Sequence, residues 1–397
     1  MWYISSCWLI FRDRLLMKIP RYIKKDILDY FSSKSKSKKN KIIILYGARQ
    51  VGKSTLVDEI LAKLSLKILK INADEVKYRE VLASQDLKKL TSLVKGYELL
   101  FIDEAQRVEN IGINLKILID NFKDLKIIIT GSSALELANK VKEPLTGRTI
   151  TYKLFPISFL ELGKKYSDFE LEDTLEERLR FGSYPEIFQY ETDLERKDYL
   201  TELAEAYLYK DIFDLTDIRH TARLKDLLKL LAFQIGSEVS LTELGQQLSM
   251  SKDTVNSYIS LLEKAFVLFR LSGFSSNLRK EVTKMDKIYF YDLGIRNILI
   301  DNLKPIKDRD DVGKLFENFL ITERLKLNSY KKAYASSYFW RTYTGAELDY
   351  VEERDAELYG YEFKYSKTKI AAPKSWRETY KAGYQLVTKD SFLDFIK

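Results

Sequence analysis

The chain has 397 residues, a length that accommodates two or three domains, each with its own core. Its net charge of +8 is uneven, because residues 1–41 hold eleven Lys/Arg and three Asp, whereas the rest holds 55 charges of each sign. No apolar run reaches the roughly 18 residues of a membrane span, which excludes an integral membrane protein. One cysteine, Cys7, excludes a disulfide framework and a Cys-based zinc site, and one histidine, His220, argues against His-triad metal sites and Ser-His-Asp triads.

The chain opens with an apolar segment and a cationic linker. Residues 1–17 are expected to be an N-terminal extension, because residues 1–11 lack the preceding positive charge and the cleavage site of a signal peptide. A translation start at Met17 and a peripheral membrane contact are the alternatives. Residues 32–41 are polar, repetitive and cationic, which is typical of a flexible linker. Without a secretion signal or a disulfide pair, we expect a cytoplasmic protein.

A phosphate-binding loop follows the first predicted strand, at residues 41–46 (KIIILY). The segment GARQVGKST fits G-x-x-x-x-G-K-[ST] and continues into a helical pattern of apolar residues. The glycines let backbone N–H groups face phosphates at a helix N-terminus, where anions are favoured. We expect Lys53 to reach the β- and γ-phosphates and the Ser54 hydroxyl to ligate Mg²⁺. The predicted nucleotide-binding residues are Gly47, Ala48, Arg49, Gln50, Val51, Gly52, Lys53, Ser54 and Thr55.

Two further apolar strands end in polar residues. Residues 99–102 (LLFI) lead into Asp103, which is expected to hold the metal through water, and Glu104, which is expected to polarise the attacking water. Residues 126–130 (KIIIT) lead into Ser132, which is expected to lie beside the γ-phosphate. Strands that alternate with helices predict a three-layer α/β domain whose ligand lies at the carboxyl ends of the strands.

Arg148 follows a glycine in a predicted loop of the segment PLTGRTITYKLFPISFLEL. A cation near a γ-phosphate, from the same chain or from a neighbouring subunit, raises hydrolysis by roughly 10³–10⁵-fold. The prediction is therefore that Arg148 is an arginine finger, with an ordinary surface arginine as the alternative.

A helix-turn-helix pattern with a wing follows a helical stretch at residues 175–233. Ser240 and Glu243 form a predicted capping box, Ser251 caps the next helix, and residues 265–271 are a predicted strand. The charges of residues 237–270 disfavour DNA binding, because this segment holds three Lys or Arg and four Asp or Glu, whereas affinity for phosphates depends on cations. Packing or docking of a protein partner is favoured over base recognition. The mildly basic residues 279–287 are the best candidate for a nucleic-acid backbone contact.

Two alternating segments near the C-terminus carry charged residues at nuclease spacing. Asp349 is followed, after twelve residues, by Glu362 and Lys364, which is the PD-(D/E)xK pattern. Two carboxylates can hold Mg²⁺ while the lysine steadies a hydroxide or the phosphate. Glu317, in a predicted helix, could add a third carboxylate. A solvated strand face is the alternative.

Taken in order, these segments resemble the prokaryotic AAA+ superfamily ATPases that carry a C-terminal winged helix and a restriction-endonuclease-like domain. The resemblance covers about residues 18–370 and rests on GARQVGKST, LLFIDEAQ, ITGSSA, LTGRTITYKLFPISFLEL, AYLYKDIFDL, KIYFYDLGIRN, LFENFLITERL, TGAELDY and EFKYS. One departure is Lys210-Asp211, where the family usually has Arg-Asp, so the charge is kept but the bidentate fork is lost.

The resemblance implies an AAA+ domain at residues 18–165, a helical region at 166–235, a winged helix at 236–285 and an endonuclease-like α/β domain at 286–397. We expect an ATPase that requires Mg²⁺ and whose nucleotide state switches the C-terminal module against an unknown protein partner. An arginine finger from a neighbour would require a homo-oligomer. An ATP-gated nuclease acting on DNA or RNA, and an ATP-binding module without turnover, are the alternatives.

Overall fold

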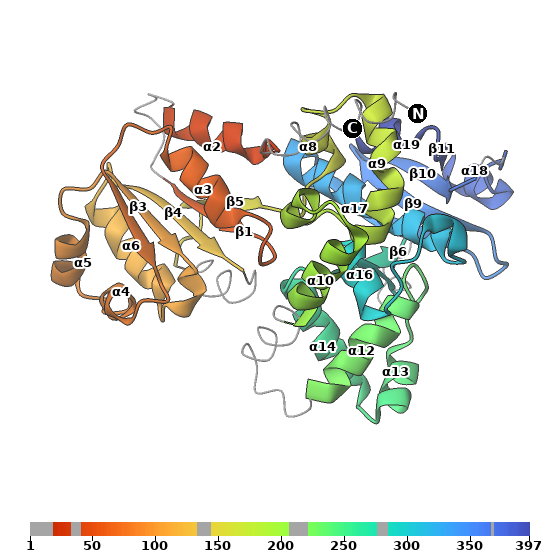
Figure 1. The fold of residues 1–397 in the computed structure, drawn as a ribbon, viewed down its shortest axis with the longest axis horizontal. Helices are drawn as coiled ribbons and strands as arrows, with labels where there is room; N and C mark the ends of the chain where they lie inside the picture. The colour runs from red at the N-terminus through yellow and green to blue at the C-terminus, as the bar shows by residue number, and fades with distance from the viewer. Residues whose placement is uncertain (1–18, 33–40, 133–143, 206–220, 276–284, 367–368) are drawn as a thin grey trace. The chain divides into compact units, whose positions relative to one another are not determined.

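The computed structural model describes residues 19–32, 41–132, 144–205, 221–275, 285–366 and 369–397. The chain divides into two compact units, one at Arg21–Phe155 and the other at Pro156–Glu263 with Val267–Lys397 (Figure 1). Within the described ranges, no helix combines the length and the apolar character needed to cross a membrane.

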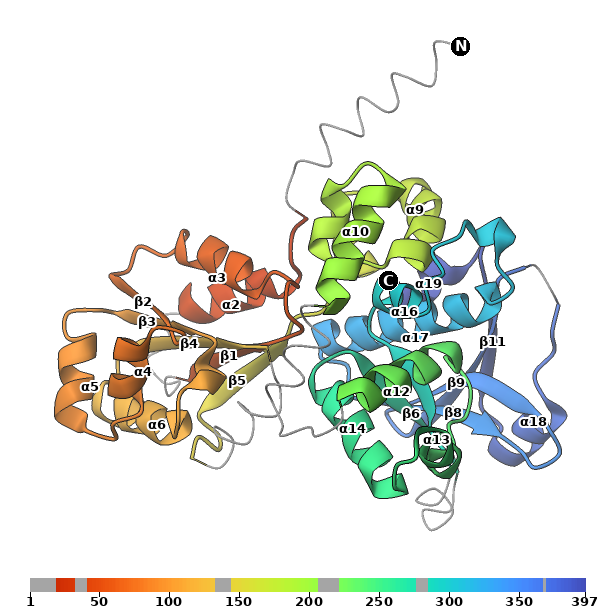
Figure 2. The same cartoon turned by 60° about the horizontal axis from the view of Figure 1, so that its bottom comes forward.

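The first unit is a parallel sheet in the order β2-β3-β4-β1-β5, with every neighbouring pair parallel. Helices α2 and α3 lie on one face of the sheet, and α4, α5 and α6 lie on the other (Figure 2). The three strands predicted from sequence are confirmed as β1, β3 and β4, and β4 separates the other two. The elements are α2 Ile23–Ser32, β1 Ile42–Tyr46, α3 Lys53–Leu61, β2 Ile68–Asn72, α4 Val76–Leu82, α5 Leu87–Val94, β3 Leu99–Asp103, η1 Ala105–Arg107, α6 Ile111–Asn121, β4 Lys126–Gly131 and β5 Thr149–Lys153.

The second unit contains a mixed sheet in the order β11-β10-β9-β8-β6-β7. The pairs β10/β11 and β6/β8 are parallel, and the other pairs are antiparallel. Its elements are α8 Phe159–Leu162, α9 Asp168–Phe181, η2 Pro185–Gln189, α10 Asp193–Leu203, α12 Thr221–Phe233, α13 Leu241–Leu248, α14 Lys252–Lys264, β6 Leu268–Gly273, β7 Lys287–Phe290, α16 Leu293–Leu299, η4 Ile306–Asp308, α17 Val312–Lys331, β8 Ala335–Arg341, β9 Glu347–Arg354, β10 Glu357–Lys364, α18 Lys374–Tyr380, β11 Gly383–Thr388 and α19 Phe392–Ile396.

Aromatic side chains fill the core around α17, the longest helix described. The Phe159 ring lies 5.0 Å from the Phe319 ring and 5.8 Å from the Phe392 ring, centre to centre, so α8, α17 and α19 share one cluster. A second hydrophobic cluster joins β8 to α18 and contains Trp340 and Trp376, whose ring centres are 5.3 Å apart. Aromatic pairs at such distances add to the stability gained by burying their area.

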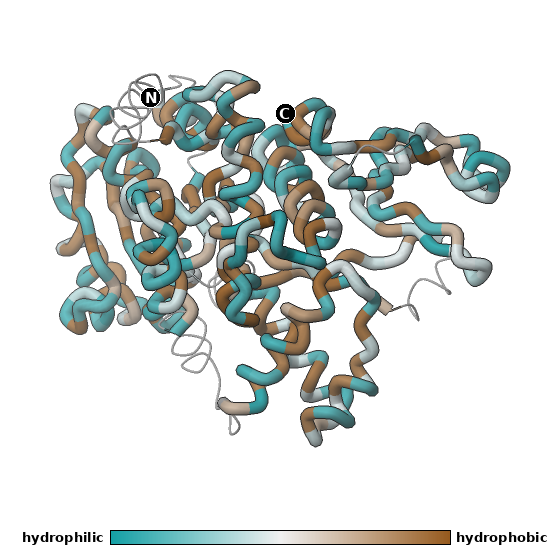
Figure 3. Tube along the Cα trace, turned by 45° about the vertical axis from the view of Figure 1, so that its right-hand side comes forward, coloured by the Kyte–Doolittle hydropathy of each residue, from teal (hydrophilic) through white to brown (hydrophobic). Residues whose placement is uncertain are grey.

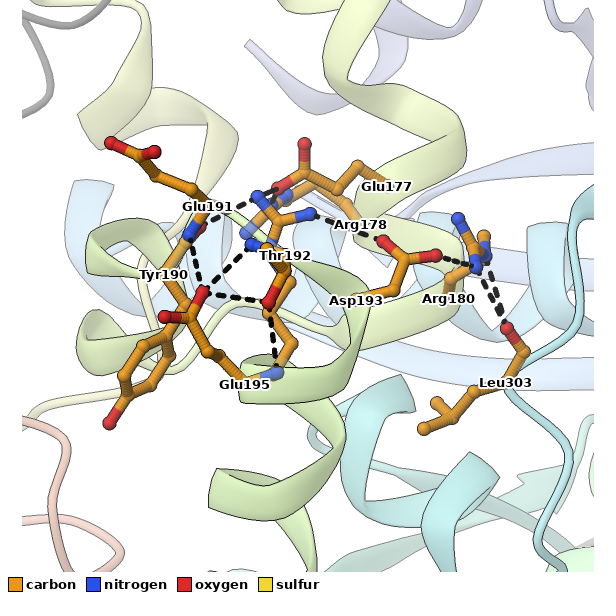
Figure 4. Close-up of polar contacts among 10 residues, drawn as sticks. Glu177, Arg178, Arg180, Tyr190, Glu191, Thr192, Asp193, Glu195 and Leu303 are labelled. Atoms are coloured by element: carbon orange, nitrogen blue, oxygen red, sulfur yellow. Dashed lines mark hydrogen bonds and ion pairs between the residues drawn. The ribbon is translucent and has the colours of Figure 1, made fainter.

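An ionic network joins α9 to α10 (Figure 4). Arg196 on α10 contacts Glu177 on α9 at 3.3 Å, and Arg180 on α9 contacts Asp193 on α10 at 2.5 Å. Thr192 caps α10 in a capping box with Glu195, which satisfies N–H groups that the helix itself leaves unpaired. These contacts fix the two helices against each other and leave their charges compensated.

The two helices of the predicted helix-turn-helix are present as α13 and α14. Ser240 accepts a hydrogen bond from the Glu243 N–H at 3.3 Å, and Ser251 accepts one from the Thr254 N–H at 3.1 Å, so both serines cap their helices. The reciprocal half of the predicted capping box, from Glu243 back to Ser240, stays a prediction. The buried positions of α14 include Val255, as expected for an amphipathic helix. In the Cα trace coloured by hydropathy, hydrophobic and hydrophilic stretches alternate along the helical segments (Figure 3). The winged-helix assignment stays a prediction, and residues 279–284 and Lys210-Asp211 lie outside the described residues.

Candidate functional site

The loop between β1 and α3 has the backbone geometry of a phosphate cradle. A Cβ at Gly47 would overlap the Leu154 carbonyl oxygen, so the backbones approach too closely there for any side chain. Gly52 takes the left-handed conformation, with φ 90°, and is the N-cap of α3 without a side-chain cap. The first N–H groups of α3 therefore remain available to an anion. All of the predicted residues Gly47–Thr55 belong to this loop and the first turn of α3.

Lys53 lies buried at the start of α3, with 6% of its surface exposed. Its ammonium donates hydrogen bonds to the carbonyls of Gly47, at 2.9 Å, and of Ala48, at 2.8 Å. Burial lowers the pKa of Lys53 to about 8, although the nearby carboxylates of Glu104 and Asp103 act in the opposite direction. The side chain thus lies inside the cradle, where a phosphate would meet it.

Asp103, at the carboxyl end of β3, is oriented on both of its oxygens. Its Oδ2 accepts a hydrogen bond from the Ser54 hydroxyl at 2.8 Å. Its Oδ1 accepts from the Thr130 hydroxyl and from the Glu104 N–H, at 3.1 Å for the latter. The two predicted metal ligands, Ser54 in the first turn of α3 and Asp103 at the end of β3, therefore meet at one point. Oxygen donors at this separation suit the shell of a small hard cation such as Mg²⁺.

Glu104 forms a triangle of hydrogen bonds with Gln106 and Ser132. Its Oε2 accepts from the Gln106 amide and, at 3.2 Å, from the Ser132 hydroxyl. The Gln106 amide also donates to Ser132 Oγ at 3.1 Å. The triangle forms because β3 and β4 are neighbours, so that the residues after their ends meet at one edge of the sheet. Gln106 was missed by sequence reasoning; its place two residues after Glu104 is the signal that could have found it.

Arg148 lies at the amino ends of the strands, whereas the phosphate loop lies at their carboxyl ends. Thr149 pairs with Ile42 at the start of β1, whereas the phosphate loop follows the end of that strand. The Arg148 guanidinium forms an ion pair with Asp120, the tenth residue of α6. This placement keeps Arg148 away from the phosphate loop of its own chain. The role of Arg148 as an arginine finger for a neighbouring subunit stays a prediction.

The C-terminal sheet brings three of the four nuclease-type residues together. The antiparallel register of β9 and β10 places Asp349 beside Glu362, and Asp349 accepts a hydrogen bond from the Phe363 N–H at 2.8 Å. Lys364 forms an ion pair with Glu362 at 2.6 Å. Burial raises the pKa of both carboxyls, and their mutual repulsion raises the pKa of Glu362 further.

Glu317, the fourth residue, lies on α17 and is engaged by donors of β7. The Lys287 ammonium forms an ion pair with Glu317 at 3.3 Å, and the Tyr289 hydroxyl donates a hydrogen bond to Glu317 at 2.6 Å. Burial raises the pKa of Glu317 to about 7, with Asp349 adding to the shift and Lys287 opposing it. In the part of the chain that the structure describes, no group of three or more His, Cys, Asp or Glu is arranged to hold a metal ion. The predicted set thus forms a polar cluster whose carboxylates bind protein donors.

Comparison with known families divides the chain into three segments. Residues 39–163 match the AAA domain family, residues 172–305 match a domain of unknown function (DUF8612), and residues 312–394 match another domain of unknown function (DUF4143). The AAA match covers the phosphate loop, Asp103, Glu104 and Ser132. It supports a P-loop, AAA-like nucleotide-binding domain in the first unit of the chain.

Similar proteins come from archaea and bacteria. The chain is 29% identical over 368 residues to the uncharacterized protein MJ1637 of Methanocaldococcus jannaschii, covering 82% of this chain and 74% of the relative. It is 26% identical over 303 residues to the uncharacterized protein MJ1544 of the same organism, covering 72% of this chain and 66% of the relative, just under two thirds of its length. It is also 26% identical over 331 residues to the uncharacterized protein Rv2008c of Mycobacterium tuberculosis, covering 82% and 71%.

Among solved structures, the chain is similar to the Walker-type ATPase paby2304 of Pyrococcus abyssi, with a TM-score of 0.47, 15% identity and coverage of 71% of this chain and 96% of the other. It also matches a RuvB variant of Thermotoga maritima, with a TM-score of 0.33, 17% identity and coverage of 63% and 88%. Both structural similarities are weak.

Proposed function

We propose that this protein binds ATP and hydrolyses it to ADP and phosphate at the edge of the sheet where β1, β3 and β4 end. The contact between Ser54 and Asp103 at 2.8 Å carries this proposal, because it joins the loop that would cradle phosphates to the acid that would hold the metal. The match of residues 39–163 to the AAA domain supports it independently.

Each side chain has a distinct task in the proposed reaction. Ser54 and Asp103 would hold Mg²⁺, which supplies charge neutralisation on the β- and γ-phosphates. The Lys53 ammonium would leave the carbonyls of Gly47 and Ala48 and donate to phosphate oxygens instead. Glu104 would orient the attacking water and polarise it as a base. Ser132 would hold a γ-phosphate oxygen with its hydroxyl.

The proposal extends to a nucleotide-dependent switch that acts on a protein partner through the C-terminal unit. A short stretch of backbone supports it. The Leu154 N–H donates to the Tyr46 carbonyl at 2.7 Å, next to the phosphate loop, whereas the Phe159 N–H donates to Glu323 of α17 at 2.7 Å. Glu323 is buried and also binds Lys326 at 2.7 Å. A change in the loop therefore has a short path to α17, along the backbone from Leu154 to Phe159 and then through one hydrogen bond to Glu323.

Turnover and binding are separated by two variants. We expect Lys53→Ala to lose most of its affinity for a nonhydrolysable ATP analogue in Mg²⁺ buffer, because the cradle loses its cation. We expect Glu104→Gln to keep that affinity and to hydrolyse ATP at least about 10²-fold more slowly, since an amide is a poor base. Phosphate release and equilibrium binding measure the two effects.

The outcomes distinguish the alternatives. Wild-type protein that binds the analogue but releases no phosphate would indicate a binding module without turnover. Wild-type protein without saturable binding would overturn the proposal.

A metal-dependent nuclease is the second candidate, favoured by the register of β9 and β10 that brings Asp349 beside Glu362 and by the ion pair of Glu362 with Lys364. Plasmid and single-stranded RNA incubated with Mn²⁺, with and without ATP, test it. Cleavage that Asp349→Ala abolishes and that Asp198→Ala, an exposed position on α10, leaves unchanged would support it. Equal behaviour of both variants would count against it.

A further inference from the structure

We infer that Gln106 is a positioning residue that holds Glu104 beside Ser132 and so links phosphate sensing to the activation of water. The inference rests on the proposed ATPase function. It starts from the triangle of hydrogen bonds in which the Gln106 amide donates both to Glu104 Oε2 and to Ser132 Oγ.

The hydrogens of the triangle can be counted. A serine hydroxyl has one hydrogen, and in this structure Ser132 donates it to Glu104 at 3.2 Å. The side-chain amide of Gln106 has two hydrogens, one for each partner. A carboxylate only accepts. Gln106 is therefore the one member of the triangle that donates to both of the others.

Arrival of a terminal phosphate would redistribute these hydrogens. Phosphate oxygens accept, so Ser132 can bind one only by turning its single hydrogen away from Glu104. Glu104 then keeps the Gln106 amide as its donor within the triangle, and its carboxylate gains capacity to accept from water. Gln106 can keep both of its contacts before and after this change. The carboxylate thus stays in place while its second donor is exchanged for the substrate water.

The local backbone supports a positioning role. Glu104 takes a left-handed conformation, with φ 51° and ψ 42°, which is uncommon for a residue with a side chain. It is the N-cap of the short turn η1, in which Gln106 lies, and Gln106 is 6% exposed. Strained conformations persist where surrounding contacts determine them. A buried side chain in the next turn is well placed to do so.

Gln106→Leu tests the inference, because leucine keeps the size and removes both donors. We expect kcat for ATP to fall by about 10²-fold, as for other misplaced catalytic groups, while the Kd of a nonhydrolysable ATP analogue changes less than about twofold. Gln247→Leu is the matched control, since Gln247, at an exposed position of α13, also donates to a glutamate, Glu243 at 3.4 Å. The control is expected to keep the wild-type kcat.

Gln106→Glu adds a readout that a purely structural role would not move. A carboxyl at this position donates a hydrogen only when it is protonated, so activity should recover as the pH falls from about 8 to about 6, whereas Gln106→Leu stays low throughout. The double variant Ser132→Ala with Gln106→Leu should be no less active than the less active of the two single variants, since both residues belong to the same hydrogen-bonded triangle.

Three results would overturn the inference. The first is a wild-type kcat in Gln106→Leu, and the second is a loss of analogue affinity that matches its loss of kcat. The third is a Gln106→Glu pH profile parallel to that of Gln106→Leu. In each case the wild type still hydrolyses ATP, so the proposed function survives. If the wild type shows no turnover, both fail together.

Discussion

At the scale of single residues, the most informative group is the Lys53 ammonium. It is buried, it binds two carbonyls of its own loop, and burial lowers its pKa to about 8. In the protein without nucleotide, a fraction of the Lys53 side chains is therefore already uncharged at slightly alkaline pH. A polyanion placed beside it favours the charged form and raises this pKa. Binding of nucleotide and protonation of Lys53 are consequently coupled.

This coupling predicts a pH dependence with a definite sign. Well below pH 8 Lys53 is already charged, so the group adds no pH dependence to binding. As the pH rises above about 8, the free protein loses this proton and must regain it on binding, so the affinity for ATP falls. Calorimetry at about pH 8.5 in two buffers of different ionisation enthalpy should detect proton uptake. Lys53→Arg, which stays charged, should show none. Affinity that rises with pH would contradict the prediction.

At the scale of elements, the junction between α9 and α16 depends on glycines. Gly182 ends α9 with φ 72° and ψ −157°, and a Cβ there would overlap the Asp292 carboxylate. Asp292 cannot easily move, because it accepts from the Ser183 N–H at 2.6 Å and caps α16 through the Gly294 N–H at 2.9 Å. Gly294 in turn packs against the Phe181 carbonyl.

Gly182→Ala is therefore expected to destabilise the second unit. The backbone strain alone costs about 1–3 kcal/mol, and displacement of Asp292 adds to it. Gly313→Ala is the matched control, because a Cβ at this position of α17 meets nothing within 4 Å. It should raise stability by at most about 0.5–1 kcal/mol, the value for the middle of a helix, because Gly313 lies in the first turn of α17. Urea denaturation followed by circular dichroism measures both, and equal midpoints would refute the account.

Local spacing predicted the parts of the site that lie next to each other in sequence. The loop from Gly47 to Thr55 and the acids after β3 follow from patterns within a few residues. The triangle around Gln106 and the pairing of Arg148 with Asp120 depend on the order of strands, which periodicity does not encode. For the same reason, the helical stretch expected over residues 175–233 did not reveal the break at Gly182, whose partner Asp292 is distant in sequence.

At the scale of the whole molecule, the position of Arg148 limits the ways in which it could contribute to a nucleotide site. It lies at the edge of the sheet opposite its own phosphate loop and pairs with Asp120. A role at a γ-phosphate would therefore require a second copy of the chain in a head-to-tail arrangement. Such an arrangement separates the Arg donor and the nucleotide site onto different subunits.

Mixed subunits test this arrangement. Arg148→Ala keeps its nucleotide site and Lys53→Ala keeps its arginine, so each is expected to be inactive alone. An equimolar mixture should recover about a quarter of the wild-type rate if subunits mix at random in head-to-tail contacts. Phosphate release at several protein concentrations measures this recovery. A mixture no more active than its components, or a fully active Arg148→Ala, would count against the arrangement.

The segment between Leu154 and Phe159 has a practical consequence for dissecting the molecule. Its first residue lies against the glycine that opens the phosphate loop, and its last is held by a buried carboxylate of α17. A few flexible residues inserted after Pro156 would slacken this tether without touching either end. If the proposed switch operates, such a variant would keep nucleotide turnover and lose the response of the remainder of the chain, so the two could be assayed separately in one polypeptide.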